Sequence, residues 1–263
     1  MATVKDVYDA LDGLAAFETQ MGFDNAGFLV GRVEKEVRTI LVALDITKGV
    51  VEEAVRLGAE LIVSHHPVIF HPVKSITDED VTGQILLELT EHQIAAICSH
   101  TNLDAAEGGV NDCLAKALAL TNIVIPHPGK NGETEDFIRR AGKAHQLGMS
   151  AQSYATYVKE RLHAANVRFV DGGRPVEWVQ VGGGSCGSML REAMESGADT
   201  FVTADVKYDV FLEAKALGMN LLDAGHFATE QVVCPALVEF LQKNFPALDV
   251  KLSQTHREVY ESV

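Results

Sequence analysis

A short repeat within the chain constrains the fold more than any other feature of the sequence. Residues 53–64 align with residues 192–203, and both segments read as a helix, then Gly-Ala and an acidic residue, then a buried strand that ends in Ser or Thr. A further helix and a strand that ends near a histidine are predicted after each copy. Two such copies predict an α/β protein with two related halves. The alternative is a coincidence between two ordinary helix–strand units.

Two adjacent histidines follow the strand of the first copy. The apolar run 61–63 indicates a buried strand, and His65 and His66 come shortly after it. Pro67 cannot donate a ladder hydrogen bond and holds His66 extended, so the pair lies where the strand becomes a loop. Ligands bind outside the carboxyl ends of strands in open α/β sheets. Because neighbouring side chains on an extended chain point to opposite sides, two imidazoles here could reach two ions; one core and one solvated histidine is the alternative.

The strand predicted over 94–98 also runs into ligand-capable side chains, which include His100 and Asp104. Asp104 lies well before the next helix, for which Asn111 is the predicted cap. Asp104 is therefore predicted to be a ligand on a loop. A carboxylate that only forms a loop turn is the alternative.

A third stretch begins at Gly225, where a strand ends and a helix that continues to Phe240 is predicted to begin. His226 and Glu230 are four residues apart, so they project from one face of this helix with about 5–6 Å between their Cβ atoms. That spacing can chelate a metal ion, although Glu230 could equally interact only with the helix dipole.

A glycine-rich loop at 182–187 precedes a helix predicted over 189–194. Such a loop can bind phosphate through free backbone N–H groups. Because it lacks a lysine and Ser/Thr at Walker spacing, close packing of the turn is the favoured interpretation.

Together the three stretches supply three imidazoles and two carboxylates, from His65, His66, Asp104, His226 and Glu230. This donor set suits Zn, Fe, Mn, Co or Ni better than Ca or Mg. Five ligands serve two ions only if one carboxylate bridges them, and positions then stay open for water. The residues therefore predict a catalytic centre with two divalent transition-metal ions per subunit.

Composition excludes several kinds of partner. The chain of 263 residues has a net charge of −15, which disfavours binding to nucleic acid and to anionic membranes. No apolar run approaches the ~20 residues of a membrane span, and the first residues lack a signal-peptide pattern. The four cysteines form no CxxC pair, which indicates free thiols in a reducing cytoplasm.

These motifs resemble the Nif-three-like dinuclear metal-centre family, whose members are also known as homologues of GTP cyclohydrolase one, type two. The matching segments, in chain order, are 24–27, 64–70, 100–104, 140–142, 183–185, 203–205 and 225–230. Phe23 replaces the tryptophan of the family's N-terminal Trp-Asp-Asn-x-Gly signature. Ala204 stands where the family usually has glycine, and the linker at 127–139 differs from its pattern. Neither departure touches a presumed ligand.

The resemblance implies two similar α/β domains, the second inserted in the first, with the metal site in the cleft between them. The expected boundaries are 1–125 plus 232–263 for the first domain and 126–231 for the second, with the crossing in the Pro- and Gly-rich segment 121–145. It also implies ligation by the five residues named above, with Glu230 as the bridge. The expected assembly is a ring-shaped homohexamer, a trimer of dimers.

Two classes of function fit such a site. In the first, the chain is a metal-dependent hydrolase of a small, nucleotide-type substrate, and the resemblance implies GTP cyclohydrolase-like activity. His100 would act as general base or acid, or only support the ligands by a hydrogen bond. In the second, the ring is a metal-holding regulator or scaffold without turnover.

Several residues in or beside the matched motifs could contact substrate or support the ligands: Asp24, Asn25, Lys74, Asn102 and Thr229. Basic groups for a triphosphate are few near these motifs, with Lys74, Arg140 and Lys207 as the candidates, which argues against GTP in particular. Most of the remaining histidines, His256 among them, are interpreted as surface or structural residues.

Overall fold

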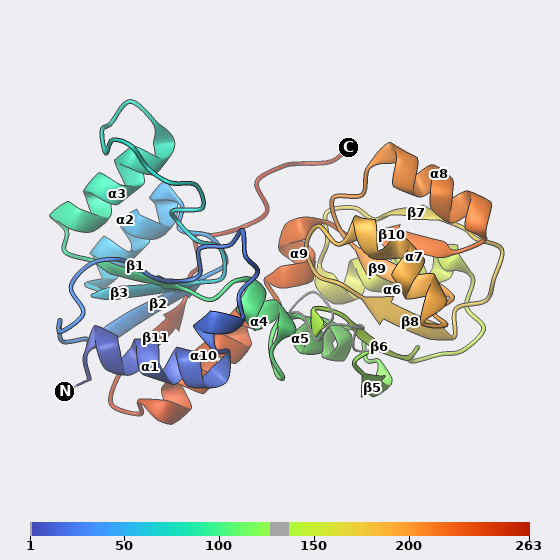
Figure 1. Cartoon of the computed structure of the whole chain (residues 1–263), viewed down its shortest axis with the longest axis horizontal. Helices are drawn as coiled ribbons and strands as arrows, with labels where there is room; N and C mark the ends of the chain where they lie inside the picture. Colours follow the sequence, from blue (N-terminus) through green and yellow to red (C-terminus); the bar gives the residue numbers. More distant parts are fainter. Residues whose placement is uncertain (1, 127–136) are drawn as a thin grey trace. The chain divides into compact units, whose positions relative to one another are not determined.

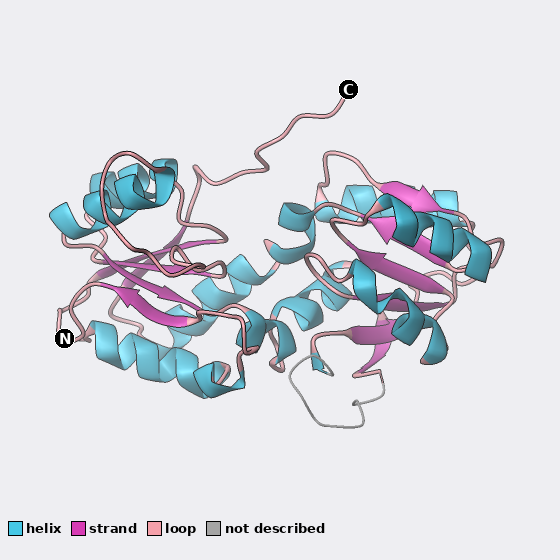
Figure 2. Cartoon of the chain, turned by 45° about the horizontal axis from the view of Figure 1, so that its top comes forward, coloured by secondary structure: helices cyan, strands magenta, loops and turns pink. Residues whose placement is uncertain are grey.

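The computed structural model describes residues 2–126 and 137–263, which form two compact units (Figure 1). Unit 1 comprises Met1–Glu107 and Cys234–Arg257, and unit 2 comprises Gly108–Val233 and Glu258–Val263. Each unit has its own sheet with helices packed beside it (Figure 2). The prediction of an α/β protein with two sheets is confirmed. The domain boundaries expected from the sequence stay a prediction, and ten residues of the expected crossing, 127–136, lie outside the described residues.

The sheet of unit 1 has the strand order β1-β4-β3-β2-β11. Its strands are β1 (Gly27–Val30), β2 (Thr39–Ala43), β3 (Leu61–Ser64), β4 (Ala95–Cys98) and β11 (Asp249–Leu252). The last four are parallel, and β1 pairs antiparallel with β4 at the edge. Because Ser64 lies opposite Cys98, the chain leaves β3 and β4 at the same edge of the sheet.

The helices of unit 1 follow the apolar periodicity and capping signals of the sequence. Thr3 and Asp6 form a capping box that starts α1, and Gly58 ends α2 in the left-handed conformation. The helices are α1 (Val4–Leu14), α2 (Lys48–Leu57), α3 (Val81–Glu91), α4 (Thr101–Ala105) and α10 (Val233–Asn244), with a 3-10 turn at Phe17–Thr19. The apolar faces of α2 and α3 pack in one core with β2, β3 and β4.

The sheet of unit 2 has the strand order β5-β6-β8-β9-β10-β7. Its strands are β5 (Thr121–Val124), β6 (Arg140–Lys143), β7 (Arg168–Val170), β8 (Trp178–Val181), β9 (Thr200–Thr203) and β10 (Asn220–Asp223). Strands β8, β9 and β10 are parallel, while β5–β6, β6–β8 and β7–β10 are antiparallel pairs. Its helices are α5 (Val110–Ala117), α6 (Ala151–Leu162), α7 (Leu190–Glu195), α8 (Tyr208–Leu217) and α9 (His226–Glu230), with a 3-10 turn at Gly187–Met189.

The two sheets share one central plan. In unit 1, β2, β3 and β4 are successive parallel neighbours and β1 pairs antiparallel with β4. In unit 2, β8, β9 and β10 are successive parallel neighbours and β7 pairs antiparallel with β10. The repeated segments 53–64 and 192–203 supply β3 and β9 with the helices before them, so the repeat is a structural one.

Three local expectations were wrong. Asp104 lies on the short helix α4 instead of a loop. Gly109, not Asn111, is the N-cap of α5, and the buried Asn111 side chain accepts a hydrogen bond from the Gly183 N–H instead. The helix that starts at His226 ends at Glu230, and α10 begins at Val233. Pro235 causes this break, because it cannot donate to the carbonyl four residues earlier and its ring clashes with it.

Two further features concern membrane-spanning helices and the state of the cysteines. Within residues 2–126 and 137–263, no helix combines the length and apolarity that crossing a bilayer needs. The four cysteines are free thiols, as predicted from the sequence.

Candidate metal centre

Three histidines of unit 1 lie together beyond the carboxyl ends of two neighbouring strands. His65 and His66 follow β3, and His100 follows β4. One ligand atom of each lies within 4.8 Å of those of the other two. The ring centroids are 4.9, 5.2 and 5.4 Å apart. This arrangement follows from the parallel register of β3 and β4, which brings the two strand ends side by side.

In each of these rings, Nδ1 lies 2.7–2.8 Å from an oxygen that can only accept a hydrogen bond. The partners are Ser99 O for His65, Asp45 Oδ1 for His66 and Asp24 Oδ1 for His100. A neutral imidazole therefore carries its proton on Nδ1 and presents the lone pair of Nε2. Metal-ligating histidines have this arrangement, in which the oxygen fixes the tautomer and the orientation of the ring.

The Asp24 carboxylate holds His100 in place. It also accepts hydrogen bonds from the backbone N–H and the hydroxyl of Thr101. Burial would raise the pKa of Asp24, but the hydrogen bonds from His100 and Thr101 and the attraction of His100 hold it well below its ordinary value. Asp24, predicted either to contact substrate or to support the ligands, is thus engaged by side chains of its own unit.

Asp45 plays the same part for His66. One carboxylate oxygen lies 2.7 Å from His66 Nδ1, and the other lies 2.8 Å from His256 Nε2. Burial would raise the pKa of Asp45, but the hydrogen bonds from His256 and His66 hold it well below its ordinary value. The sequence reasoning missed both Asp45 and His256. Asp45 directly follows the apolar run 40–44, so the rule that found the histidines would have found it, whereas no strand was predicted before His256.

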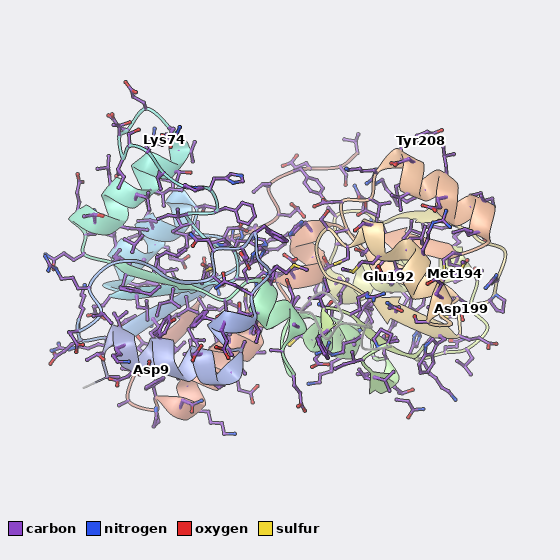
Figure 3. The ribbon with its side chains drawn as sticks, in the orientation of Figure 1. Asp9, Lys74, Glu192, Met194, Asp199 and Tyr208 are labelled. Atoms are coloured by element: carbon purple, nitrogen blue, oxygen red, sulfur yellow. The ribbon has the colours of Figure 1, made fainter. Side chains whose placement is uncertain are left out.

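The remaining candidates in unit 1 have varied surroundings. Asp104 Oδ1 lies 3.6 Å from His65 Nε2, so this carboxylate stands beside the histidine group. Asn102 is buried, accepts from the His100 N–H and donates to Ala15 O, which fixes the turn into α4. Asn25 donates its side-chain amide to Ile69 O. Lys74 is exposed on the loop before α3 (Figure 3).

Unit 2 holds the other predicted pair on α9. His226 Nε2 lies 2.9 Å from Glu230 Oε2, and His226 Nδ1 lies 2.6 Å from Asp205 Oδ2. His226 therefore repeats the pattern of unit 1, with Nδ1 on a carboxylate and Nε2 toward a candidate ligand. Glu230 is only 3% exposed, which a carboxylate that merely interacts with the helix dipole does not require.

The glycine-rich loop after β8 packs against this pair. Gly184 has a left-handed φ of +63°, and a Cβ at this position would lie 2.1 Å from Glu230 Oε1. The buried Thr229 accepts a hydrogen bond from the Gly184 N–H and donates to carbonyls of its own helix turn. The N–H groups of Gly182, Gly183, Gly184 and Cys186 all donate within the unit. The loop therefore serves close packing, as favoured from the sequence, rather than phosphate binding.

These residues fit a transition-metal site. In unit 1, three imidazoles have Nδ1 on an oxygen acceptor, and Asp104 lies beside them. In unit 2, His226 has Nδ1 on Asp205 and Nε2 beside Glu230. Imidazole nitrogen and carboxylate oxygen are the donors that Zn, Fe, Mn, Co and Ni accept. His65, His66 and Asp104 belong to unit 1, and His226 and Glu230 belong to unit 2.

The fold and these residues define a class: two-sheet α/β proteins whose strand ends carry histidines and carboxylates able to hold metal ions. Comparison with known proteins gives the family. The model of the Duf34/NIF3 (NGG1p interacting factor 3) family matches residues 2–259, and the chain belongs to this family. The resemblance seen in the sequence motifs is therefore confirmed.

Individual relatives agree with this assignment. The chain is 31% identical to a Clostridium perfringens protein named GTP cyclohydrolase 1 type 2 homolog, covering 94% of this chain and 92% of the relative. It is 34% identical to a Streptomyces coelicolor protein of the same name, covering 89% and 84%. A crystal structure of a hypothetical protein of Staphylococcus aureus superposes with a TM-score of 0.92 at 30% identity, covering 99% of each chain. A Bacillus cereus protein described as related to NIF3 shares the fold, with a TM-score of 0.91 at 24% identity, over 100% and 99% of the two chains.

Proposed function

We propose that this protein is a dinuclear-metal-dependent hydrolase of a small, nucleotide-type substrate. The observation that carries the proposal is the repeated orientation of the imidazoles: His65, His66 and His100 each engage an oxygen acceptor through Nδ1, which in a neutral ring puts the lone pair on Nε2. Structural histidines have no need of a common tautomer. Rings that hold a metal ion do, because Nε2 must be unprotonated.

In this proposal, the ligands of the two units serve one pair of divalent transition-metal ions per subunit, Zn, Fe, Mn, Co or Ni. His65, His66, Asp104 and His226 would hold the ions, and Glu230 would bridge them. When bound, such ions supply Lewis acidity and an activated water near neutral pH. The proposal draws support from the burial of Glu230 and from the fit of Gly184 against it.

His100 is the proposed general base or acid. Its Nδ1–H bond to Asp24 holds the ring in one orientation, and the carboxylate would stabilise the imidazolium that forms when Nε2 takes a proton. His100 Nε2 would thus receive the proton of the attacking water and return it to the leaving group. Asp24 acts by positioning His100.

The names of the curated relatives make GTP a candidate substrate, with hydrolytic opening of the purine imidazole ring as the reaction. We also propose that the protein assembles as a ring-shaped homohexamer, because symmetric closure is the rule for homo-oligomers. The proposed location is the cytoplasm. Light scattering of the purified protein tests the assembly, and a stable monomer at micromolar concentration would contradict it.

Metal analysis joined to an activity screen tests the proposed function. Elemental analysis should find up to two transition-metal ions per chain after purification or reconstitution with Zn or Mn. The loaded protein should hydrolyse at least one member of a panel of nucleotides, nucleosides and phosphoesters. His66→Ala should lose metal, whereas His92→Ala is the matched control, because His92 is an exposed histidine paired with Glu88.

Two results would decide against the proposal in different ways. Absence of bound metal after reconstitution would remove the dinuclear centre itself. Full metal loading without turnover of any tested compound would favour a metal-holding regulator or scaffold.

A further inference from the structure

Two phenylalanines with large exposed fractions stand beside the histidine group of unit 1. Phe23 is 62% exposed and Phe70 is 39% exposed. Their ring centroids are 6.3 Å apart with an interplanar angle of 65°, an edge-to-face pair. Scattered apolar side chains on a surface are ordinary, but adjoining aromatic rings next to a polar site mark a place where an apolar ligand surface binds.

The loops that carry these rings are held firmly. The Asn25 side chain ties the segment after Phe23 to the backbone of Ile69, directly before Phe70. Asp24 is anchored by its N–H to Met21 O and by its carboxylate to His100. The rings are therefore displayed in a fixed arrangement, which lowers the entropy cost of binding a ligand.

Phe70 connects this pair to the imidazoles. Its ring centroid lies 6.1 Å from that of His100, with the two planes at 83°. His71 also packs against Phe70, with ring centroids 4.9 Å apart. The partly exposed Phe70 ring is therefore in ring contact with the proposed general base.

The charges around the site disfavour a polyanion. Asp24, Asp45 and Asp104 surround the histidines with carboxylates. Together with Glu230, they balance the four positive charges of two divalent ions, so little net positive charge is left to attract a triphosphate. The chain as a whole carries a net charge of −15.

We propose that Phe23 and Phe70 form a stacking platform for a planar, uncharged aromatic heterocycle, a nucleobase or nucleoside, and present it to His100. This inference rests on the proposed function, because it names the substrate class of the same site. Recognition comes from the faces of the rings, and phosphate groups contribute no affinity. A nucleoside thus binds at least as tightly as the corresponding triphosphate.

Binding measurements on the metal-loaded full-length protein test this inference. Equilibrium dialysis with guanosine, GTP and ribose 5-phosphate compares the wild type with Phe70→Leu and Phe23→Leu, which keep an apolar side chain but remove the ring. Phe169→Leu is the matched control, because Phe169 of unit 2 is also 39% exposed. Guanosine should bind, ribose 5-phosphate should not, and Phe70→Leu should weaken guanosine binding by about tenfold or more. The control should bind like the wild type.

Each other outcome has a distinct meaning. Equal binding by Phe70→Leu and Phe169→Leu would overturn the platform, as would GTP or ribose 5-phosphate binding more tightly than guanosine. A loss of metal ions in Phe70→Leu would also overturn it, because the ring would then act by holding the histidines. Ring-dependent guanosine binding without any turnover would support the platform while contradicting the hydrolase function.

Discussion

The ends of β3 and β4 in unit 1 and the ends of β9 and β10 in unit 2 are equivalent places that carry different chemistry. The repeat aligns Ser64 with Thr203, so His65 and His66 correspond to Ala204 and Asp205. Unit 1 therefore places imidazoles where unit 2 places a methyl group and a carboxylate.

The supporting groups differ in a matching way. His66 needs Asp45, from the end of a neighbouring strand, as the acceptor for its Nδ1. In unit 2, Asp205 stands at the position equivalent to His66 and is itself the acceptor for His226. The same backbone position thus supplies a candidate ligand in one unit and the support of a candidate ligand in the other. A duplicated fold fixes where side chains meet, and each copy is then free to change what they do.

The largest effect is expected for Glu230, the candidate bridging carboxylate, which lies on α9 of unit 2. Glu230→Gln keeps the volume and the helix but removes the charge. Two divalent ions ~3.5–4 Å apart repel strongly, and a shared anion makes that separation tolerable. The variant should lose at least one ion and nearly all hydrolytic activity, whereas His66→Ala should lose one ion and keep the other partly bound. Metal counting, with circular dichroism to verify the fold, distinguishes them.

Retention of both ions at wild-type affinity in Glu230→Gln would mean that Glu230 is not the bridge. A carboxylate of unit 1, such as Asp104, would then have to bridge the ions. Unit 2 would in that case not supply the bridging ligand.

A smaller effect is expected from the two supporting carboxylates. Asp45→Asn and Asp205→Asn each remove a charge from the acceptor of an imidazole Nδ1–H, and asparagine tolerates the left-handed φ of +50° at position 205. Loss of such support typically weakens metal binding by about 10–100-fold. Asp45→Asn should have the larger effect, because Asp45 also holds His256 and is more buried. Competition with a metal chelator measures both affinities, and equal losses would contradict this ranking.

The sequence predicted the parts of the fold and site that depend on local pattern. The strand-end histidines and the repeat were readable because the apolar runs of β3 and β9 stop abruptly at polar residues. The break between α9 and α10 was missed, although Pro235 marks it, because the apolar periodicity continues across the gap. The partnership of Asp45 with His256 was out of reach, since it depends on the pairing of β11 with β2, strands about 200 residues apart in the chain.

Two glycines of unit 2 with similar backbone strain allow a test of whether the fit of the glycine-rich loop against Glu230 matters for metal binding. Gly184 and Gly173 both have left-handed φ, but a Cβ on Gly184 would collide with Glu230, whereas a Cβ on Gly173 would meet open space. Alanine at either position should lower the free energy of unfolding by about 1–2 kcal/mol. Only Gly184→Ala should also weaken metal binding, because the Glu230 carboxylate must move. Urea unfolding and metal titration measure the two effects separately, and normal metal binding by Gly184→Ala would show that the fit against Glu230 is not required.

The smallest effect concerns the last residue of β4, Cys98, which corresponds to Asp223 at the end of β10. The Asp223 carboxylate accepts hydrogen bonds from the Val206 and Gly225 N–H groups and pairs with Arg168, so unit 2 has an ion pair at this place. Burial, with a contribution from the Asp24 charge, raises the pKa of the Cys98 thiol to about 12, so unit 1 keeps a neutral group. A raised pKa leaves the thiol protonated at pH 8, and the thiol form is a poor nucleophile. Iodoacetamide should therefore leave Cys98 unmodified in the folded protein at pH 8 and alkylate it after unfolding in urea, as peptide mass spectrometry can measure. Fast alkylation in the folded state would mean that the end of β4 opens to solvent. Burial would then not keep the Cys98 thiol protonated, and the contrast with Asp223 would be contradicted.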